Sequence, residues 1–201
     1  MTQTPYIVGF GGTTRPKSTS ERLVATVLAE ARALGARTDL FGGETLATLP
    51  HYTPENQNRT EGQSTFLEAI RRADGIVIGT PAYHGGISAL VKNAIDLIAD
   101  LQSDARVFLD GRPVGIVVAA GGWQGAGATL SATRDIVHAL RGWPTPVGVA
   151  ATSSSVFDAE GRLVDAALAK TVAAQARQLT TFVNAVAHYN APLPLRPYNS
   201  A

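Results

Sequence analysis

The sequence predicts a single α/β domain, a three-layer sandwich in which a five-stranded parallel sheet lies between two layers of helices. Short apolar runs rich in β-branched residues alternate along the chain with longer stretches whose apolar residues recur at helical spacing. Bare or hydroxyl-rich loops follow several of the apolar runs. With 201 residues, of which 45% are hydrophobic, the chain is long enough to build one sizeable core.

The strands and helices alternate in sequence. The expected strands are Tyr6–Phe10, Ala36–Leu40, Gly75–Ile78, Pro113–Ala119 and Pro146–Ala150. Helices are expected from about Leu23 to Leu34, over Glu61–Ala73, from Ser88 to about Asp100, from about Leu130 to Leu140, and over Leu163–Ala187. The polar stretch Gly42–Arg59 is expected to be a surface loop, and Pro81 is expected to end strand pairing. Residues 1–190 are assigned to the domain, and 191–201 to a proline-rich, extended tail.

Composition disfavours several classes of function. There are 17 Lys and Arg against 16 Asp and Glu, and no basic stripe, so nucleic acid is a poor candidate partner. The absence of cysteine excludes disulfides, thiolate catalysis and Cys-ligated metal. The histidines have no partners at metal-ligand spacing, so no metal site is expected. No apolar run approaches the ~20 residues of a membrane span, and the first residues lack the pattern of a signal peptide, which predicts a cytoplasmic protein without a membrane partner.

The first loop, Gly11–Ser20, joins a strand to the start of a helix, a geometry that suits an anion because free backbone N–H groups and the helix dipole point at it. The hydroxyls and the positive charge in this loop belong to Thr13, Thr14, Ser18, Ser20 and Arg15. Pro16 breaks the P-loop pattern, and Thr14 stands where a dinucleotide fingerprint needs its third glycine. We expect a site for one phosphate group, with Ser20 equally suited to be only the helix N-cap.

Two later loops also follow strands and carry little side-chain bulk. Tyr83 offers a face for stacking, and Gly85 and Gly86 let the backbone approach a flat ring closely. The second of these loops, Ala120–Gly127, is expected to lead into a helix. Ligands of open α/β sheets bind outside the carboxyl ends of the strands, so the three loops are expected to form one site for a flat ring with a phosphate.

The first loop together with Thr80–Asp96 resembles the flavodoxin-like NAD(P)H-dependent FMN reductases, along most of the chain. Thr80-Pro-Ala-Tyr83 and Lys92-Asn-Ala-Ile-Asp96 are the most specific part of this resemblance. It implies a flavodoxin-like three-layer sandwich and a phosphate site for FMN. The implied FMN phosphate ligands are Thr13, Arg15, Ser18 and Ser20. Contacts to the isoalloxazine are implied for Pro81, Ala82, Tyr83, His84 and Gly85, and contacts to its pyrimidine end for Gly121 and Gly122.

The sequence departs from the family in one place, because many members have Pro-Glu-Tyr-Asn where this chain has Pro-Ala-Tyr-His. The role of that acidic side chain is therefore not carried over. Trp123 is expected either to cover the flavin or to pack at a subunit contact.

The resemblance implies hydride transfer from NADPH or NADH to FMN, without a catalytic acid or base from the protein. It also implies delivery of reduced FMN to a flavin-dependent monooxygenase, and assembly as a homodimer or homotetramer. Two alternatives keep FMN bound: a reductase of quinones or azo dyes, and a flavodoxin-type electron carrier. The carrier is disfavoured by the net charge of +1, since such carriers tend to be strongly acidic. A Rossmann NAD-binding module, with Asp39 as its acidic residue, is a further alternative.

Overall fold

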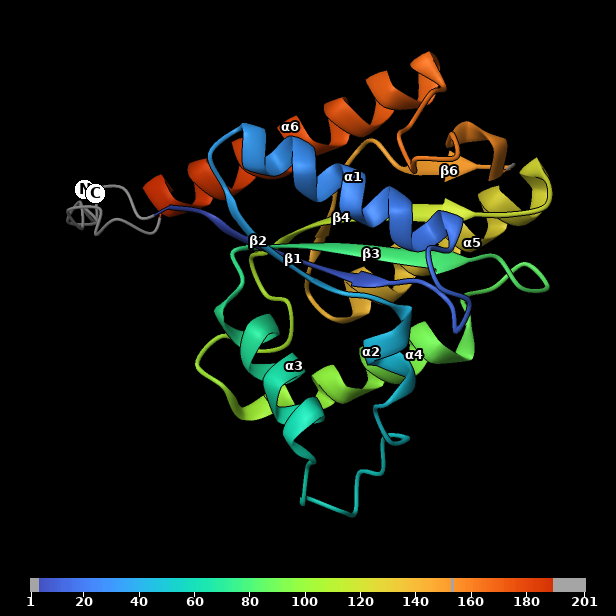
Figure 1. Cartoon of the computed structure of the whole chain (residues 1–201). Coiled ribbons are helices and arrows are strands. Elements are labelled where there is room, and N and C mark those ends of the chain that lie inside the picture. The colour runs from blue at the N-terminus through green and yellow to red at the C-terminus, as the bar shows by residue number, and fades with distance from the viewer. Residues whose placement is uncertain (1–3, 153, 190–201) are drawn as a thin grey trace, which may run out of the picture.

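The computed structural model describes residues 4–152 and 154–189, which form a sheet covered by helices on both faces (Figure 1). Helices α1 (Thr19–Ala33) and α6 (Ala166–Tyr189) pack on one face. Helices α2 (Gly43–Ala47), α3 (Glu61–Arg72), α4 (Ala89–Leu97) and α5 (Trp123–Ala139) pack on the other. A 3₁₀ turn, η1 (Ile98–Ser103), continues α4. The predicted three-layer α/β sandwich is confirmed.

Four of the five positions in the sheet are filled as expected. Strands β1 (Tyr6–Gly11), β2 (Arg37–Phe41), β3 (Gly75–Pro81) and β4 (Pro113–Ala119) pair in parallel in the order β2-β1-β3-β4. The fifth position is shared by two short strands. Strand β5 (Trp143–Pro144) pairs with the start of β4, and β6 (Val149–Ala151) pairs with its end.

The central strands alternate their side chains between two cores, as strands buried on both faces must. Val8, Ile78 and Val118 belong to the core under α3, α4 and α5. Ile7, Val77 and Val117 belong to the core under α1 and α6. Because both faces of the central sheet are buried, these strands have apolar residues at consecutive positions and not at alternate ones.

The join between β5 and β6 is held by the last helix. The Gln175 side-chain amide donates to the carbonyl oxygens of Ile116 and Val147, at 3.0 and 2.9 Å. The side-chain oxygen of Gln178 accepts from the Val147 N–H at 2.9 Å. A methyl group at Gly148 would come within 2.7 Å of Leu130, so the chain passes close under α5 here. These contacts explain why only the end of the expected strand Pro146–Ala150 is found in a strand: its first half is a corner bound by side chains.

Several helices differ from those expected. Helix α1 begins at Thr19 and not near Leu23, because Ser18 caps it. Helix α5 begins at Trp123 and not near Leu130, because Gly122 is extended and starts the helix directly. Helix α6 begins at Ala166, since Leu163 bridges to Phe157 and Asp165 accepts the Leu168 N–H in a cap. The expected loop after Gly42 contains the short helix α2.

Strand β3 extends three residues beyond the expected Gly75–Ile78 and includes Pro81, which was expected to end the pairing. Pro81 pairs in register with Ala119, and the next N–H, that of Ala82, donates to the Ala119 carbonyl at 2.8 Å. Proline is tolerated there because it stands at the end of the ladder. The predicted tail, 191–201, lies outside the described residues. In the part of the chain that is described, no helix is long and apolar enough to cross a membrane.

Candidate functional site

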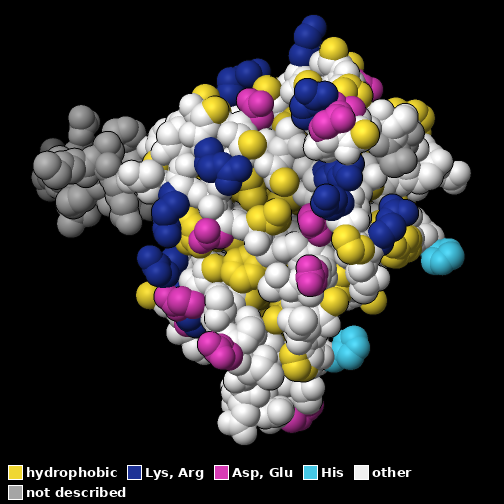
Figure 2. All heavy atoms as spheres, in the orientation of Figure 1, with side chains coloured by type: hydrophobic (Ala, Val, Ile, Leu, Met, Phe, Trp, Pro, Cys, Tyr) yellow, Lys and Arg dark blue, Asp and Glu magenta, His cyan; other side chains and the backbone are white. Residues whose placement is uncertain are grey.

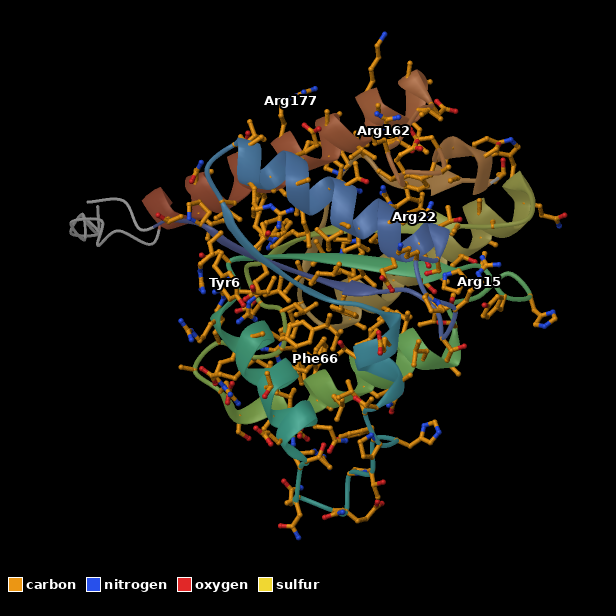
Figure 3. All side chains as sticks on the ribbon, in the orientation of Figure 1. Tyr6, Arg15, Arg22, Phe66, Arg162 and Arg177 are labelled. Atoms are coloured by element: carbon orange, nitrogen blue, oxygen red, sulfur yellow. The ribbon has the colours of Figure 1, made fainter. Side chains whose placement is uncertain are left out.

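A pocket of about 550 Å³ lies at the carboxyl ends of β1, β3, β4 and β6. This is where an open α/β sheet binds its ligands. The volume is within the usual range for small-molecule sites. Its lining comes from all three loops singled out in the sequence and from the end of the last strand: Thr13, Thr14, Arg15, Ser18, Thr19, Ser20, Pro81, Ala82, Tyr83, Ala119, Ala120, Gly121, Ala151 and Thr152. Figure 3 shows Arg15 at this end of the sheet and Tyr6 at the opposite end.

The first loop ends in the N-cap of α1. The cap is Ser18, whose hydroxyl oxygen accepts the Glu21 N–H at 3.4 Å, so Ser20 is not the cap. The two serine hydroxyl oxygens lie 3.4 Å apart, and the residues are only 2% and 1% exposed. The N–H groups of the first helical turn have no acceptor within the helix and point out of its start. The loop therefore places two hydroxyls and several N–H groups at one point.

The rest of the first loop is shaped by local and distant hydrogen bonds. The Thr13 hydroxyl accepts the Arg15 N–H at 3.1 Å and turns the chain, leaving Arg15 exposed at the mouth of the pocket. The Glu21 carboxylate accepts the Gly43 N–H at 2.8 Å. This hydrogen bond connects α1 to the start of α2 and so holds the base of the first loop in place.

Glycines let the backbones beneath the first loop come into direct contact. A methyl group at Gly11, whose φ is +149°, would lie 2.0 Å from the Gly79 carbonyl oxygen. One at Gly79 would lie 2.2 Å from a Val24 methyl, and one at Gly43 would lie 1.9 Å from the Thr13 carbonyl oxygen. No side chain fits at these three positions. The floor of the pocket at this end is therefore set by backbone packing.

The second wall is a short hairpin after β3. The backbones of Tyr83 and Gly86 exchange two hydrogen bonds of 3.0 Å, and the two residues between them, His84 and Gly85, have φ of 54° and 80°. Positive φ at both central residues is what a type I′ turn requires. The base of the hairpin is closed by Thr80, whose hydroxyl donates to the Pro81 carbonyl at 2.9 Å and accepts the Ser88 N–H at 3.1 Å.

The hairpin presents an aromatic ring to solvent. Tyr83 is 54% exposed at the edge of the pocket. Methyl groups at Gly125 and Gly85 would lie 3.9 Å from Ala82 and Ala128 respectively, so the hairpin rests on the first turns of α5 through small residues. His84 and Gly85 form the tip of the turn and are not part of the pocket lining.

The third wall is the end of β4 and the start of α5. The Ala120 N–H donates to the Ala151 carbonyl at 2.9 Å, which joins this wall to β6. Nothing lies within 4 Å of a methyl group built at Gly121 or Gly122. Gly121 lines the pocket, whereas Gly122 caps α5 and is outside the lining. The structure thus leaves open space along this wall.

The sequence did not identify Thr19, Ala119, Ala120, Ala151 and Thr152 as lining residues. These residue types do not by themselves indicate a ligand site. The expected position of the last strand beside β4 was the one feature of the sequence that could have indicated Ala151 and Thr152. Lys92 and Asp96 form an ion pair on α4. Asn93 holds a neighbouring segment, because it donates to the carbonyls of Leu49 and Pro50 and accepts the Tyr52 N–H.

The face of the molecule that carries α1 and α3 has mixed charge. On the face shown in Figure 2, Lys and Arg side chains alternate with Asp and Glu, and no basic area stands out. Among residues 4–152 and 154–189, no group of three or more His, Asp or Glu side chains could hold a metal ion. The polar groups of the pocket are hydroxyls, backbone N–H groups and the Arg15 guanidinium.

Comparison with solved structures identifies the fold. The chain superposes on the flavoenzyme NAD(P)H:(acceptor) oxidoreductase FerB from Paracoccus denitrificans with a TM-score of 0.74 and 17% identity, covering 90% of this chain and 98% of that one. It superposes on an apo NADH:FMN oxidoreductase (EMOB) with a TM-score of 0.65 and 17% identity, covering 96% and 92%. A flavodoxin, WrbA-like protein from Agrobacterium tumefaciens gives a TM-score of 0.60 at 17% identity, covering 90% and 99%. The flavodoxin-like fold is confirmed.

Sequence relatives agree with this. An FMN-dependent NADPH-azoreductase from Staphylococcus haemolyticus is 37% identical over 89 residues, 44% of either chain. Its counterpart from Staphylococcus aureus is 32% identical over 102 residues, 51% of this chain and 50% of that one. The chain thus spans about half the length of the curated relatives it matches. The family model for NADPH-dependent FMN reductases matches residues 5–156, and the chain belongs to that family.

Proposed function

We propose that this chain binds FMN in the pocket and catalyses hydride transfer to it from NADPH or NADH. One observation carries the proposal: a helix start with two buried hydroxyls and a bare, open wall line the same pocket. FMN needs both, because its phosphate is an anion and its isoalloxazine is flat. Relatives whose names specify FMN and NADPH support the choice of cofactors.

The FMN phosphate fits the first loop. The hydroxyls of Thr13, Ser18 and Ser20 would donate hydrogen bonds to the phosphate, as would the first backbone N–H groups of α1. The Arg15 guanidinium, at the entrance of the pocket, would add a charged hydrogen bond. The buried hydroxyls of Ser18 and Ser20 lie 3.4 Å apart, so a phosphate oxygen near one of them would also lie near the other.

The isoalloxazine fits between the other two walls. Pro81, Ala82 and Tyr83 would pack along one side, with His84 and Gly85 at the tip of the same hairpin. Gly121 and Gly122 would let backbone N–H groups come close to the pyrimidine end, where they would favour negative charge.

FMN supplies the hydride-accepting chemistry when bound, so the protein's part is to position two rings and to exclude water. No side chain of this pocket needs to donate or remove a proton. This is consistent with a lining of hydroxyls, alanines and Gly121, in which Arg15 and Tyr83 are the ionisable groups among the described residues.

The test is anaerobic stopped-flow absorbance of the FMN-loaded protein with each nicotinamide cofactor. Rapid loss of the flavin band near neutral pH is expected, and the two rates give the cofactor preference. Binding of FMN without bleaching would instead indicate an electron carrier. Failure to bind FMN would overturn the assignments in all three loops.

A second candidate function is a reductase of azo dyes or quinones that keeps its FMN. The names of the staphylococcal relatives favour it. Gel filtration separates the two: FMN that stays with the protein supports the azo or quinone reductase, and FMN that elutes separately supports a reductase of free flavin. A monooxygenase partner, a homodimer or homotetramer, and a cytoplasmic location stay predictions.

A further inference from the structure

Helices α1 and α3 begin with the same capping signal but use it differently. In a capping box, Ser or Thr at the N-cap pairs with Glu or Gln three residues later, and each side chain accepts the other residue's backbone N–H. At α3 the box is complete, because the Thr60 hydroxyl accepts the Gln63 N–H at 3.3 Å and the Gln63 side chain accepts the Thr60 N–H at 3.0 Å. Ser18 and Glu21 have the same spacing at the start of α1. The sequence thus provides a second box.

At α1 only half of that box is formed. The Ser18 hydroxyl accepts the Glu21 N–H at 3.4 Å, but the Glu21 carboxylate does not accept the Ser18 N–H in return. Its Oε2 accepts the N–H of Gly43, at the start of α2, at 2.8 Å. Within residues 4–152 and 154–189, the Ser18 N–H has no hydrogen-bond acceptor, and neither have those of Thr19 and Ser20. Three consecutive donors are therefore left open.

Glycines make room for the Glu21 carboxylate in this position. A methyl group at Gly12 would lie 2.9 Å from Glu21 Oε2, and one at Gly42 would lie 3.1 Å from the same atom. The donor, Gly43, is itself fixed, since a methyl group there would lie 1.9 Å from the Thr13 carbonyl oxygen. The carboxylate is therefore enclosed by backbone on the side away from the N-cap.

The open donors and the diverted carboxylate lie on different sides of the loop. Ser18, Thr19 and Ser20 line the proposed FMN pocket, whereas Glu21 and Gly43 do not. A carboxylate bonded to the Ser18 N–H would occupy that donor and would place a negative charge where an anion has to bind. Because Glu21 is bonded to Gly43, both the donor and the space stay free for an anion from outside.

We propose that Glu21 is a positioning residue for FMN binding: the Gly43 N–H holds its carboxylate off the N-cap, so that the Ser18 N–H can donate to the FMN phosphate. The inference rests on the proposed function. Glu21 acts without touching the ligand. If its carboxylate is displaced from Gly43, it completes the capping box, as Gln63 does in α3, and competes with the phosphate for the Ser18 N–H. This competition affects only ligands that carry a phosphate.

Gly42 offers a way to displace the carboxylate. Its φ of −73° and ψ of 175° suit alanine, and the three atoms nearest to an added methyl group all belong to the Glu21 carboxyl group. G42A is expected to raise the dissociation constant of FMN about threefold, the size expected for one carboxylate at a helix start. The dissociation constant of riboflavin, which lacks the phosphate, is expected to stay the same. Quenching of flavin fluorescence measures both.

A double-mutant cycle shows whether G42A acts through Glu21. In the E21A background the competing carboxylate is absent, so adding G42A is expected to leave the dissociation constant of FMN unchanged. Q63A is the matched control, because it opens the complete capping box of α3, and Gln63 is outside the pocket lining. Q63A is expected to lower stability and to leave the binding of both flavins unchanged.

Amide NMR of the ¹⁵N-labelled protein gives a readout that does not depend on activity. The Ser18 amide proton of the parent protein is expected to shift when FMN or inorganic phosphate is added, and to stay in place with riboflavin. The Gly43 amide proton is expected to stay in place in all three titrations. In G42A without ligand, both amide protons are expected to shift, since Glu21 leaves one and bonds to the other.

Three results would overturn the inference. One is a Ser18 amide proton that does not respond to bound FMN. Another is an effect of G42A on FMN binding that persists in the E21A background, and the third is an equal effect of G42A on riboflavin. If FMN binds and NADPH bleaches it in any of these cases, the proposed reductase function stands and the role of Glu21 alone falls. If the parent protein binds no FMN, the proposed function falls as well.

Discussion

The two ends of the proposed FMN pocket are built in opposite ways. Under the first loop, the backbones of Gly11, Gly43 and Gly79 touch their neighbours so closely that no methyl group fits. Along the third wall, a methyl group at Gly121 or Gly122 would touch nothing within 4 Å. Glycine serves close packing at one end and empty space at the other.

This difference suggests separate roles for the two ends: one for holding an anion, the other for access of a second molecule. The packed end would fix the position of a bound anion, since its hydroxyls and N–H groups cannot shift without moving β1, β3 and α1 together. The open end, bordered by the exposed rings of Tyr83 and Trp123, leaves room for a second molecule to arrive. A ligand would be anchored by its phosphate and approached at its ring.

The strongest test of this contrast is a pair of identical substitutions. G11A forces a methyl group to 2.0 Å from the Gly79 carbonyl oxygen at a φ of +149°, and is expected to lower the free energy of unfolding by about 3 kcal/mol. G121A has open space and is expected to change it by less than about 0.5 kcal/mol. Urea denaturation measures both. Equal losses would remove the distinction between the two ends.

The hairpin between these ends is expected to depend on the buried hydroxyl of Thr80. T80V keeps the shape but leaves the Ser88 N–H and the Pro81 carbonyl without their partner. The free energy of unfolding is expected to fall by about 2 kcal/mol. T80S, which keeps the hydroxyl, is the matched control. If T80V proves as stable as T80S, the hydroxyl does not hold the hairpin.

A smaller effect is expected on binding alone. S20A removes a buried hydroxyl that is not the helix cap, so it is expected to weaken FMN binding about tenfold, for one lost hydrogen bond to a charged group. Riboflavin, which lacks the phosphate, is the control ligand, and its dissociation constant is expected to stay the same. Isothermal titration measures both. A similar loss for riboflavin would place the phosphate elsewhere.

The smallest effect is expected at the far end of the sheet. The Tyr6 hydroxyl donates to the Asp39 carboxylate at 2.6 Å, and burial together with this bond raises the Tyr6 pKa to about 12. The folded state therefore keeps this proton above the pKa of about 10 that the unfolded chain has. Stability from Tyr6 is complete below pH 10 and is lost as the pH rises toward 12.

Y6F is expected to cost about 1 kcal/mol at pH 7, and this difference is expected to shrink between pH 10 and 12. FMN affinity should not change, because Tyr6 lies at the opposite end of the strands from the pocket (Figure 3). Guanidinium denaturation at several pH values gives the comparison. Parallel stability curves for the parent and Y6F would contradict the assigned pKa.

Much of this arrangement can be predicted from the sequence. The apolar runs at β1 and β4 were predicted to within one residue. The starts of β3 and α4 were also predicted, because the run at Gly75 is apolar and the shift to helical spacing after Ser88 is sharp, whereas their ends differ by about three residues. The three loops that follow them meet in one pocket, as the position of their strands required.

The features that were missed have physical reasons. Gly125 and Gly127 made the first turns of α5 look like a loop in the sequence. In the structure the hairpin packs against these turns. The corner between β5 and β6 depends on side chains of a helix some thirty residues later, which no local pattern shows. Ala151 and Thr152 line the pocket through their backbone position, and neither residue type indicates it.

The hydrogen bonds of Gln175 and Gln178 have a consequence for biosynthesis. A chain leaves the ribosome from its amino end, so the residues of the first loop emerge long before helix α6. Yet the corner at Val147, and the β6 wall that follows it, are held by side chains of that helix. A nascent chain that stops short of α6 lacks the side chains that hold this wall of the ligand site. Completion of this wall of the site therefore waits for the synthesis of α6.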